Sequence, residues 1–405
     1  MNAVWSCLAF VLICAGHAEL WVTAVNRSHG LAWPQRVLKR LRRVHDVAIV
    51  GFPVVILAGF GFAAPGEFLS GRWAGLSPLA LTTFGASALG LIGLTASTAV
   101  WWTRTRPCQN RTDRNEVLDV RKALGCSPIG DGALAWLAAA PGNQQFELDI
   151  SEKTLEPPRW PAALNGLSIL HLSDWHLCPT YRREFYELAA QRAAHLRTDL
   201  VAFTGDLFDD PDCLDWLTST LGRLAAPLGA WFILGNHDSW HDHARFRQAL
   251  ESLGWRDVAG RTVVVDAGPH PLLLAGDETP WMGVQPQWPA ADDRPRVLLS
   301  HTPDHFPRAA REGVDVVLAG HNHGGQVQLP VIGPVYAPSR YGCRYPAGVF
   351  SSGACRMHVS RGLAGRHPLR IGCRPEITRL TIRCPSPSSS LASARNSAHR
   401  EVRAS

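Results

Sequence analysis

The chain has 405 residues, 18% of them charged, with a formal net charge of +6. This length leaves room for more than one domain, and so modest a charge does not indicate a nucleic-acid-binding protein. Much of the positive charge lies between Arg27 and Arg43 and in the C-terminal tail, a distribution that favours a membrane surface. None of the ten cysteines forms a C-x-x-C pair, so a zinc ribbon or thioredoxin motif has no support, and their scatter suits free thiols in a reducing compartment.

Three hydrophobic stretches fall within residues 1–102, which we predict to be a transmembrane region. Residues 78–102 carry no charge over 25 positions, enough to cross a bilayer, and end in two tryptophans suited to its interface. Residues 47–64 are also charge-free but shorter, and they contain a proline. Residues 3–24 include His17 and Glu19, which should face other helices because a charge in lipid is costly. We therefore expect two or three transmembrane helices.

The orientation of these helices follows from the basic residues between them. Six Lys and Arg residues lie in the stretch 26–46, so the positive-inside rule places this loop in the cytoplasm. The short loop 65–77 then lies outside, and the chain after 102 returns to the cytoplasm whether or not 3–24 spans. A signal peptide is the alternative for 3–24, but it would lack the basic n-region. The expected location is the cell membrane, with several passes and a cytoplasmic C-terminal domain.

The remaining chain divides into a connector, a large domain and a tail. Residues 103–143 indicate a juxtamembrane connector with one or two short helices, 144–383 an α/β domain, and the Ser-rich 384–405 a disordered tail. Short apolar runs alternate with helical patterns in the large domain, which is typical of an α/β sandwich. The predicted strands are 146–150, 168–172, 200–203, 230–234, 262–265, 272–274, 297–299, 314–318, 356–360 and 377–382, and the predicted helices are 182–194, 213–224 and 244–253.

Five polar clusters follow predicted strands of this domain. Each cluster alone resembles an ordinary turn, because Gly, Asn and Asp are common turn formers. Five of them in order at strand ends predict a ligand site, since the carboxyl ends of strands in α/β sheets are where ligands bind. Carboxylate and imidazole together suit a divalent transition metal. The clusters are Asp174-Trp175-His176, Gly205-Asp206-Leu207-Phe208-Asp209, Gly235-Asn236-His237-Asp238, His301 and Gly320-His321-Asn322-His323.

These clusters resemble the calcineurin-like metallophosphoesterases, whose pattern is D-x-H, G-D-x-x-D, G-N-H-D/E, H and G-H-x-H. The resemblance covers roughly residues 144–383, and the phrases LSILHLSDWHL and GHNHGGQVQLP look most like the bacterial membrane-associated branch of that family. It implies a double β-sheet sandwich flanked by helices, with two divalent metal ions held at the strand ends. Mn, Fe and Zn all suit such a mixed oxygen and nitrogen ligand set.

The resemblance also assigns roles to individual residues. The ligands that it implies for the first metal are Asp174, His176, Asp206 and His323, and those for the second are Asp206 as a bridge, Asn236, His301 and His321. Two such ions clamp the attacking and leaving oxygens of an in-line displacement. His237 would stabilise the developing charge or protonate the leaving oxygen, with Asp209 orienting it. Asp238 is expected to tie down its own loop.

We therefore expect a membrane-anchored binuclear phosphoesterase that hydrolyses a phosphoester or pyrophosphate bond at the cytoplasmic face. The tether favours a lipid-linked substrate and contact with membrane lipids, and no nucleic-acid partner is predicted. One alternative is a cyclic-nucleotide or nucleotide phosphodiesterase, and another is a non-catalytic membrane sensor or scaffold. The chain has neither a G-x-x-x-x-G-K-[ST] phosphate loop nor a G-x-S-x-G nucleophile motif.

Several neighbours of the clusters are left open by the sequence. Trp175 and Trp240 could wall the pocket or pack beneath the metals. The segment 276–293, with Trp281 and Trp288, is predicted to be an irregular loop that could shape specificity. Three further histidines near the clusters are more often satisfied polar groups than substrate ligands. They are His171, His241 and His243.

Overall fold

The computed structural model describes residues 3–103, 111–268, 270–290 and 292–385, and the chain divides into two compact units. The helical unit consists of Met1–Thr105 together with Leu329–Arg344, and the sheet unit of Arg106–Gln328 together with Tyr345–Ser405. The segment Leu329–Arg344 thus belongs to the helices, although more than two hundred residues separate it from them in the sequence. The predicted tail 384–405 lies almost wholly outside the described residues.

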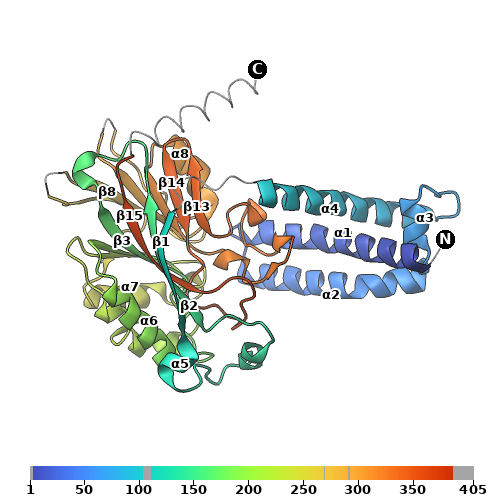
Figure 1. The fold of residues 1–405 in the computed structure, drawn as a ribbon, viewed down its shortest axis with the longest axis horizontal. Helices are drawn as coiled ribbons and strands as arrows, with labels where there is room; N and C mark the ends of the chain where they lie inside the picture. The colour runs from blue at the N-terminus through green and yellow to red at the C-terminus, as the bar shows by residue number, and fades with distance from the viewer. Residues whose placement is uncertain (1–2, 104–110, 269, 291, 386–405) are drawn as a thin grey trace. The chain divides into compact units, whose positions relative to one another are not determined.

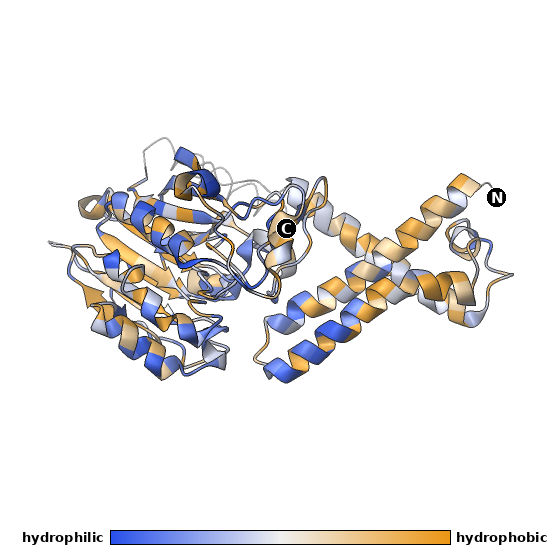
Figure 2. Cartoon of the chain, turned by 90° about the horizontal axis from the view of Figure 1, so that it is seen from below, coloured by the Kyte–Doolittle hydropathy of each residue, from blue (hydrophilic) through white to orange (hydrophobic). Residues whose placement is uncertain are grey.

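Three long helices lie side by side in the helical unit, and a short one caps them (Figure 1). They are α1 (Ala3–His29), α2 (Gln35–Gly59), α3 (Ala64–Leu69) and α4 (Pro78–Thr103). Two of the described helices, α1 and α4, are long and apolar enough to cross a membrane. Figure 2 shows the contrast with α2, whose first half is hydrophilic and whose second half is hydrophobic.

The stretch predicted to span at 47–64 is not one of these two helices. Helix α2 begins at Gln35, inside the basic stretch, and ends at Gly59, so the charge-free part is only about half of a helix that runs beside α1. The basic stretch 26–46 is not a loop either, because it comprises the end of α1, a short turn and the start of α2. The stretch that does qualify, besides 78–102, is 3–24 within α1.

Small residues allow α1 and α4 to approach each other closely. A Cβ atom on Gly16 would lie 1.9 Å from the carbonyl oxygen of Ser87, and one on Gly90 would lie 2.0 Å from the carbonyl oxygen of Gly16. Only glycine fits at either position without displacing backbone. Such small-residue contacts are typical of packed membrane helices, where close backbone approach replaces the hydrophobic driving force.

The two polar residues of α1 are accommodated differently. The imidazole of His17 stacks on the Phe52 ring of α2, with 3.6 Å between ring centroids, and accepts a hydrogen bond from Trp21. His17 thus faces another helix, as predicted. Glu19 instead accepts a hydrogen bond from Thr23 in its own helix and is half-buried.

The sheet unit is a sandwich of two mixed β-sheets, which confirms the predicted fold class (Figure 1). Among the described residues the first sheet contains, in order, β1 (Arg111–Asp119), β2 (Glu147–Leu155), β15 (Glu376–Ile382), β3 (Leu167–Leu172), β4 (Leu200–Thr204), β5 (Ala230–Ile233) and β6 (Arg256–Asp257). The second contains β13 (Gly348–Ser352), β14 (Cys355–Val359), β10 (Val316–Ala319), β9 (Arg296–Ser300), β8 (Leu272–Asp277) and β7 (Thr262–Val265).

Helices cover the outer faces of both sheets. The apolar faces of α6 (Arg183–His195) and α7 (His243–Ser252) pack on the first sheet, and α8 (Phe306–Arg311) packs on the second. The core between the sheets joins apolar side chains of both, including Ile169 and Val297. Central strands are buried on both faces, which explains why they read as continuous apolar runs rather than alternating ones.

The central strands of each sheet run parallel, so their carboxyl ends lie at one edge. In the first sheet Leu172 pairs with Phe203, and Phe203 with Phe232, which aligns the ends of β3, β4 and β5. In the second sheet β9 and β10 are likewise parallel and aligned. This register brings the polar clusters that follow the strands to one edge of the sandwich.

Two local predictions differ from the structure. The predicted helix 213–224 is two short 3-10 turns, Pro211–Leu217 and Leu221–Arg223, interrupted at Thr220, whose φ and ψ of −110° and −95° are not helical. The connector contributes the edge strand β1 as well as the short helix α5 (Val120–Leu124). The sequence of β1 is charged and lacks an alternating apolar pattern, so no strand was expected there.

Every cysteine in the described part of the chain is a free thiol, as the scatter of the cysteines in the sequence suggested.

Candidate metal centre

The five polar clusters lie immediately after β3, β4, β5, β9 and β10. Backbone hydrogen bonds continue between them beyond the ends of the strands. The amide of Asp174 donates to the Gly205 carbonyl at 2.9 Å, and the amide of His176 donates to the Asp206 carbonyl at 3.0 Å. The loops are therefore held in register by their own backbones, which fixes where each polar side chain leaves the sheet.

Five of the seven predicted ligands have a left-handed backbone, a conformation that is uncommon for residues other than glycine. Their φ angles are 53° for Asp174, 46° for His176, 56° for Asp206, 69° for His321 and 48° for His323. Strained conformations of this kind persist only where the surrounding structure enforces them, and they are concentrated at functional sites. These left-handed residues turn the backbone so that the candidate ligands of the different clusters point toward one another.

Glycines of the clusters provide the space for this arrangement. A Cβ atom on Gly320 would lie 1.9 Å from the hydroxyl oxygen of Ser173 and 2.3 Å from a carboxylate oxygen of Asp174. One on Gly235 would lie 2.2 Å from a carboxylate oxygen of Asp206. Glycine is required at both positions because the neighbouring loop occupies the volume of a side chain.

One group of potential ligand atoms, all within 4.8 Å of one another, comes from Asp174, His176, Asp206 and His323. The Nε2 atoms of His176 and His323 are 3.2 Å apart, and His176 Nε2 is 3.5 Å from Asp206 Oδ2. His323 Nε2 lies 3.4 Å from Asp174 Oδ1. These are the four residues that the family resemblance assigns to the first metal.

A second group consists of Asp206, His301 and His321, again within 4.8 Å. Asn236 extends it, because its Oδ1 lies 3.0 Å from His301 Nε2. His301 Nε2 is also 3.1 Å from His321 Nδ1 and 3.3 Å from Asp206 Oδ1. Asp206 is the one residue that both groups contain, which is the position expected of a bridging carboxylate.

The donor set fits divalent cations. The other ring nitrogen of His301, Nδ1, is 2.8 Å from the Thr204 carbonyl, and a carbonyl can only accept, so Nδ1 carries the hydrogen. In the neutral imidazole Nε2 then offers a lone pair, although it faces acceptor atoms of Asn236 and Asp206. A bound cation resolves this repulsion, and oxygen and imidazole ligands suit the metals of the middle transition series.

The electrostatics of the site lead to the same conclusion. Burial opposes the charged form of both histidines, yet the Asp209 carboxylate, followed by Asp206, raises the pKa of His176 to about 9. The Asp206 carboxylate likewise raises the pKa of buried His301 to about 9. Although burial opposes ionisation of Asp206, His301 holds the pKa of this carboxyl well below its usual range. The site thus attracts positive charge, which protons supply when no cation is bound.

His237 and Asp209 lie beside the two groups. Asp209 Oδ1 forms a short hydrogen bond with His237 Nδ1 and lies 3.1 Å from His176 Nδ1. His237 Nε2 points toward the site, at 4.0 Å from Asp206 Oδ2. One carboxylate thus orients two imidazoles. Asp238 accepts hydrogen bonds from the backbone amides of Leu207, Phe208 and Gly235, so it ties down the loops as expected.

The aromatic residues near the clusters divide into two kinds. Trp175 is fully buried and packs against Tyr186 and Phe203, so it points inward. The Trp240 ring lies against His237, with 4.1 Å between ring centroids and a tilt of 38°. Trp281 lies 4.8 Å from the ring of His321, which places part of the segment 276–293 at the site. The other tryptophan of that segment, Trp288, packs on the core of the second sheet.

Two of the other histidines near the clusters lie outside the two groups of potential metal ligands, and one arginine that the sequence analysis did not name lies beside them. His171 is buried and is hydrogen-bonded to His358 and Thr204, whereas His243 is exposed at the start of α7. Arg370, which the sequence analysis missed, is fully buried and has a guanidinium nitrogen 3.3 Å from His323 Nδ1. It lies outside every motif, so only the fold reveals it.

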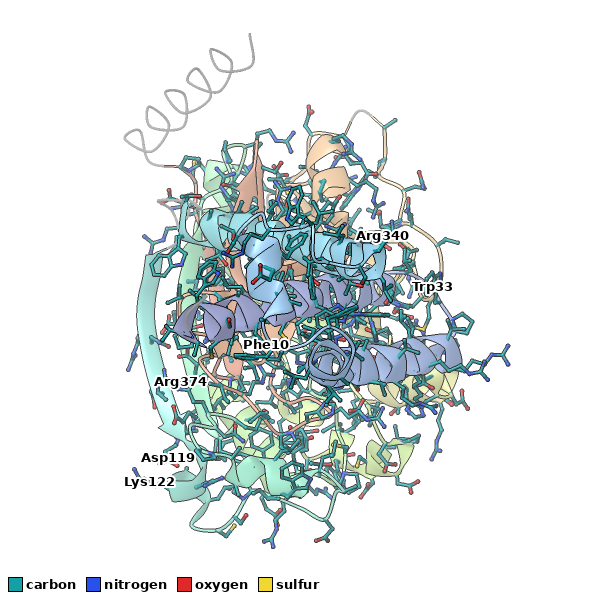
Figure 3. The ribbon with its side chains drawn as sticks, turned by 90° about the vertical axis from the view of Figure 1, so that its right-hand side faces the viewer. Phe10, Trp33, Asp119, Lys122, Arg340 and Arg374 are labelled. Atoms are coloured by element: carbon teal, nitrogen blue, oxygen red, sulfur yellow. The ribbon has the colours of Figure 1, made fainter. Side chains whose placement is uncertain are left out.

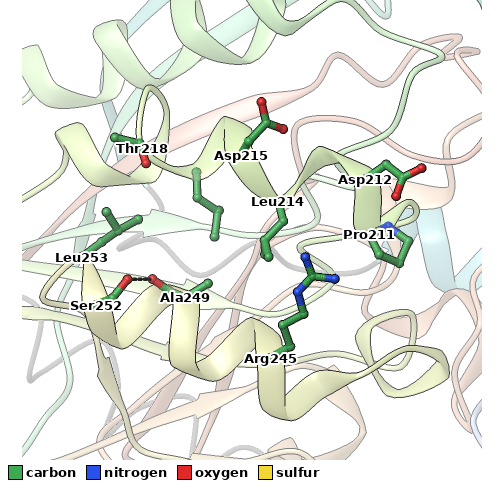
Figure 4. Close-up of a pocket in the computed structure, with 10 residues that line it drawn as sticks. Pro211, Asp212, Leu214, Asp215, Thr218, Arg245, Ala249, Ser252 and Leu253 are labelled. Carbon is green, nitrogen blue, oxygen red and sulfur yellow. Dashed lines mark hydrogen bonds between the residues drawn. The ribbon is translucent and has the colours of Figure 1, made fainter.

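A hollow of about 610 Å³ lies elsewhere, between the turn Pro211–Leu217 and helix α7 (Figure 4). Its lining includes Leu214, Arg245 and Leu253, and none of the predicted metal ligands. Because it lacks their donor atoms, this hollow is separate from the candidate metal centre.

The comparisons with known proteins cover the part of the chain that contains the candidate metal centre. Residues 167–325 match the model of the family described as calcineurin-like phosphoesterase. The metallophosphoesterase YkuE of Bacillus subtilis is 30% identical to this chain, over 58% of this chain and 86% of its own length. Phosphodiesterase YaeI of Escherichia coli is 29% identical, over 53% of this chain and 81% of its own.

A third relative is UDP-2,3-diacylglucosamine pyrophosphatase LpxG of Chlamydia muridarum, 27% identical over 54% of this chain and 84% of its own. The three alignments each cover most of the relative and little more than half of this chain. The chain therefore belongs to the calcineurin-like phosphoesterases and is a metal-dependent phosphoester hydrolase.

Proposed function

We propose that this protein is a membrane-anchored phosphoesterase with two metal ions, which hydrolyses a phosphodiester or pyrophosphate bond at the cytoplasmic face. The observation that carries the proposal is the position of Asp206 in both groups of ligand atoms. A single carboxylate with two anionic oxygens can hold two cations close together, as in-line displacement at phosphorus requires. Asp174, His176 and His323 would complete one set, and Asn236, His301 and His321 the other.

Bound ions would supply a water of lowered pKa as the nucleophile and neutralise charge on the phosphoryl oxygens. His237 would act on the leaving oxygen. Its Nδ1 is engaged by Asp209, so its Nε2 remains directed at the site to donate a hydrogen bond or a proton. Asp209 would hold both His237 and His176 in the orientation that this step needs.

The helical unit supports the membrane anchor. Helices α1 and α4 are each long enough to cross a bilayer. The end of α1, the start of α2 and the end of α4 lie at one end of the unit, since Asn26, Arg42 and Trp102 all contact the segment Leu329–Arg344. The basic stretch therefore lies at the end from which the chain continues into the sheet unit. By the positive-inside rule this end is cytoplasmic.

The tether and the relatives suggest which substrates to compare. A membrane anchor favours a lipid-linked phosphoester or pyrophosphate, which is the class named for LpxG, whereas YaeI is named only as a phosphodiesterase. A nucleotide phosphodiesterase is the second candidate. Hydrolysis of UDP-diacylglucosamine, cyclic AMP and a dinucleotide by the same preparation would separate the two.

The activity itself is tested with full-length protein in detergent, loaded with Mn²⁺ and assayed on bis-p-nitrophenyl phosphate. Asp206→Ala and His321→Ala should abolish hydrolysis, because each removes a ligand of the proposed centre. Asp212→Ala is the matched control, since Asp212 lies at the separate hollow. Full activity in Asp206→Ala would overturn the proposal. Metal content measured on the purified protein identifies the ions.

A further inference from the structure

The segment Leu329–Arg344 follows the last metal-ligand cluster in the sequence but packs on the helices. Asn26 of α1, which is buried, donates to the Val335 carbonyl and accepts from the Ala337 amide, both at 3.1 Å. Trp102 of α4 donates to the Val331 carbonyl at 2.6 Å. These bonds engage the backbone of the segment, so it is fixed to α1 and α4 along much of its length.

The outer side of the segment is apolar and exposed. Val331 is 67% exposed, and Leu329 and Tyr341 are 43% and 40% exposed. Two tryptophans at the same end of the helical unit are also exposed, Trp102 at 66% and Trp33 at 47% (Trp33 is labelled in Figure 3). Tryptophan and tyrosine beside aliphatic side chains are the composition of a protein surface at the boundary between lipid and water.

Basic residues surround this apolar surface. The first three turns of α2 carry exposed cations, which are Arg36, Lys39, Arg40, Arg42 and Arg43. The guanidinium of Arg42 lies 5.3 Å from the ring centre of Tyr336 in the segment, so the two elements form one surface. Arg340 of the segment donates to the Gly30 carbonyl at 3.1 Å. A basic amphipathic helix beside exposed aromatic residues suits the anionic headgroups of a bilayer.

Both ends of the segment connect to the loop that carries His321 and His323. Leu329 follows that loop in the sequence. On return, the Tyr345 carbonyl accepts from the Asn322 side chain at 2.8 Å, and the Pro346 carbonyl accepts from the Gly324 amide at 3.1 Å. The chain therefore leaves the metal-ligand loop, packs on the helices, and returns to the same loop.

We propose that Leu329–Arg344 and the first turns of α2 together form a binding surface for anionic phospholipid headgroups. This proposal rests on the membrane anchor of the proposed function but not on its catalytic activity. The apolar side chains would enter the interface while the cations contact the lipid phosphates.

The test uses full-length protein in nanodiscs of phosphatidylcholine, with and without phosphatidylglycerol. Two measurements are made, the enrichment of phosphatidylglycerol among lipids retained by the protein and the hydrogen exchange of residues 329–344. We expect enrichment, and slower exchange in the anionic discs. Arg40→Gln should weaken phosphatidylglycerol binding about fivefold, as expected for one cation at a membrane surface. Val331→Asp should remove the slower exchange.

Each variant has a matched control. Arg72→Gln removes an exposed cation beyond α3, at the other end of the helical unit, and Val284→Asp alters a valine that is also 67% exposed but belongs to the sheet unit. Both should behave as wild type. Equal retention of the two lipids, or an equal loss in Arg72→Gln, would overturn the proposal. Repeating both measurements in Asp206→Ala separates lipid binding from catalysis, because that variant should bind lipid normally while inactive.

Discussion

At the residue scale, the D-x-H tripeptide places neighbouring side chains on opposite sides of the backbone. Asp174 and His176 converge on the candidate metal centre, whereas Trp175 between them packs into the core against Tyr186 and Phe203. The buried indole holds this loop in place while the positive φ angles of its two neighbours aim the ligands outward from the core. The two candidate ligands and the tryptophan between them therefore depend on one another for their positions.

His237 offers a way to separate chemistry from metal binding. If His237 is the acid that we propose, its replacement in His237→Ala should lower kcat by about 100-fold or more, because positioned acid catalysis contributes at least this much. Metal content should remain unchanged, since His237 belongs to neither ligand set that contains Asp206. Kinetics and metal analysis on the same preparation check this. Loss of one metal equivalent would instead identify His237 as a ligand.

The raised pKa values of His176 and His301, about 9 each, predict how metal binding depends on pH. Below pH 9 the metal-free protein holds both protons, and a cation must displace them. The affinity for Mn²⁺ should therefore rise between pH 7 and 9, by at most about 100-fold per pH unit for two protons. Calorimetric titration at several pH values measures this slope. A flat profile would contradict the prediction.

The same pKa shifts determine how the stability of the metal-free protein depends on pH. A pKa raised above the usual value near 6.5 means that folding favours the protonated form. The stabilisation is fully present below pH 6.5 and is lost as the pH rises through about 9. The metal-free protein should thus be less stable at pH 9 than at pH 6.5.

At the element scale, the close contact between α1 and α4 depends on glycine. Gly16→Leu or Gly90→Leu would place a side chain where the opposing backbone lies, and overpacking of this kind costs about 1–3 kcal/mol. We expect a lower unfolding temperature in detergent for either variant. Gly93→Leu in the same helix is the control, because a Cβ atom there meets nothing within 4 Å. Equal destabilisation by Gly93→Leu would show that the contact is not responsible.

Much of the sheet unit was predictable because each strand and its polar cluster can be recognised from a few consecutive residues. Buried parallel strands such as β3 and β4 read as short apolar runs, and each delivers its polar cluster at the next residues. The edge strand β1 was missed because its side chains are charged, and its pairing with β2 depends on a distant part of the chain. The start of helix α2 was missed because one continuous helix joins a basic half, read as a loop, to an apolar half.

At the scale of the whole molecule, the sequence could predict which polar residues lie together but not which unit each segment joins. The motif GHNHGGQVQLP reads as one continuous loop, yet the unit boundary falls between Gln328 and Leu329 inside it. Membership of the helical unit depends on hydrogen bonds to Asn26 and Trp102, which lie in the first quarter of the chain. No local pattern encodes such a partner.

The connectivity of the two units has a practical consequence for producing the hydrolase without its helices. The chain passes between the units three times, once before the sheet unit and twice at the limits of Leu329–Arg344. A truncated chain beginning at Arg111 would still carry this segment, stripped of the helices that cover it, and should aggregate. Replacing the segment with a short Gly-Ser linker should restore a monodisperse product, as size-exclusion chromatography would report. For this enzyme, removing the helical unit requires deletion of Leu329–Arg344 as well as truncation of the N-terminus.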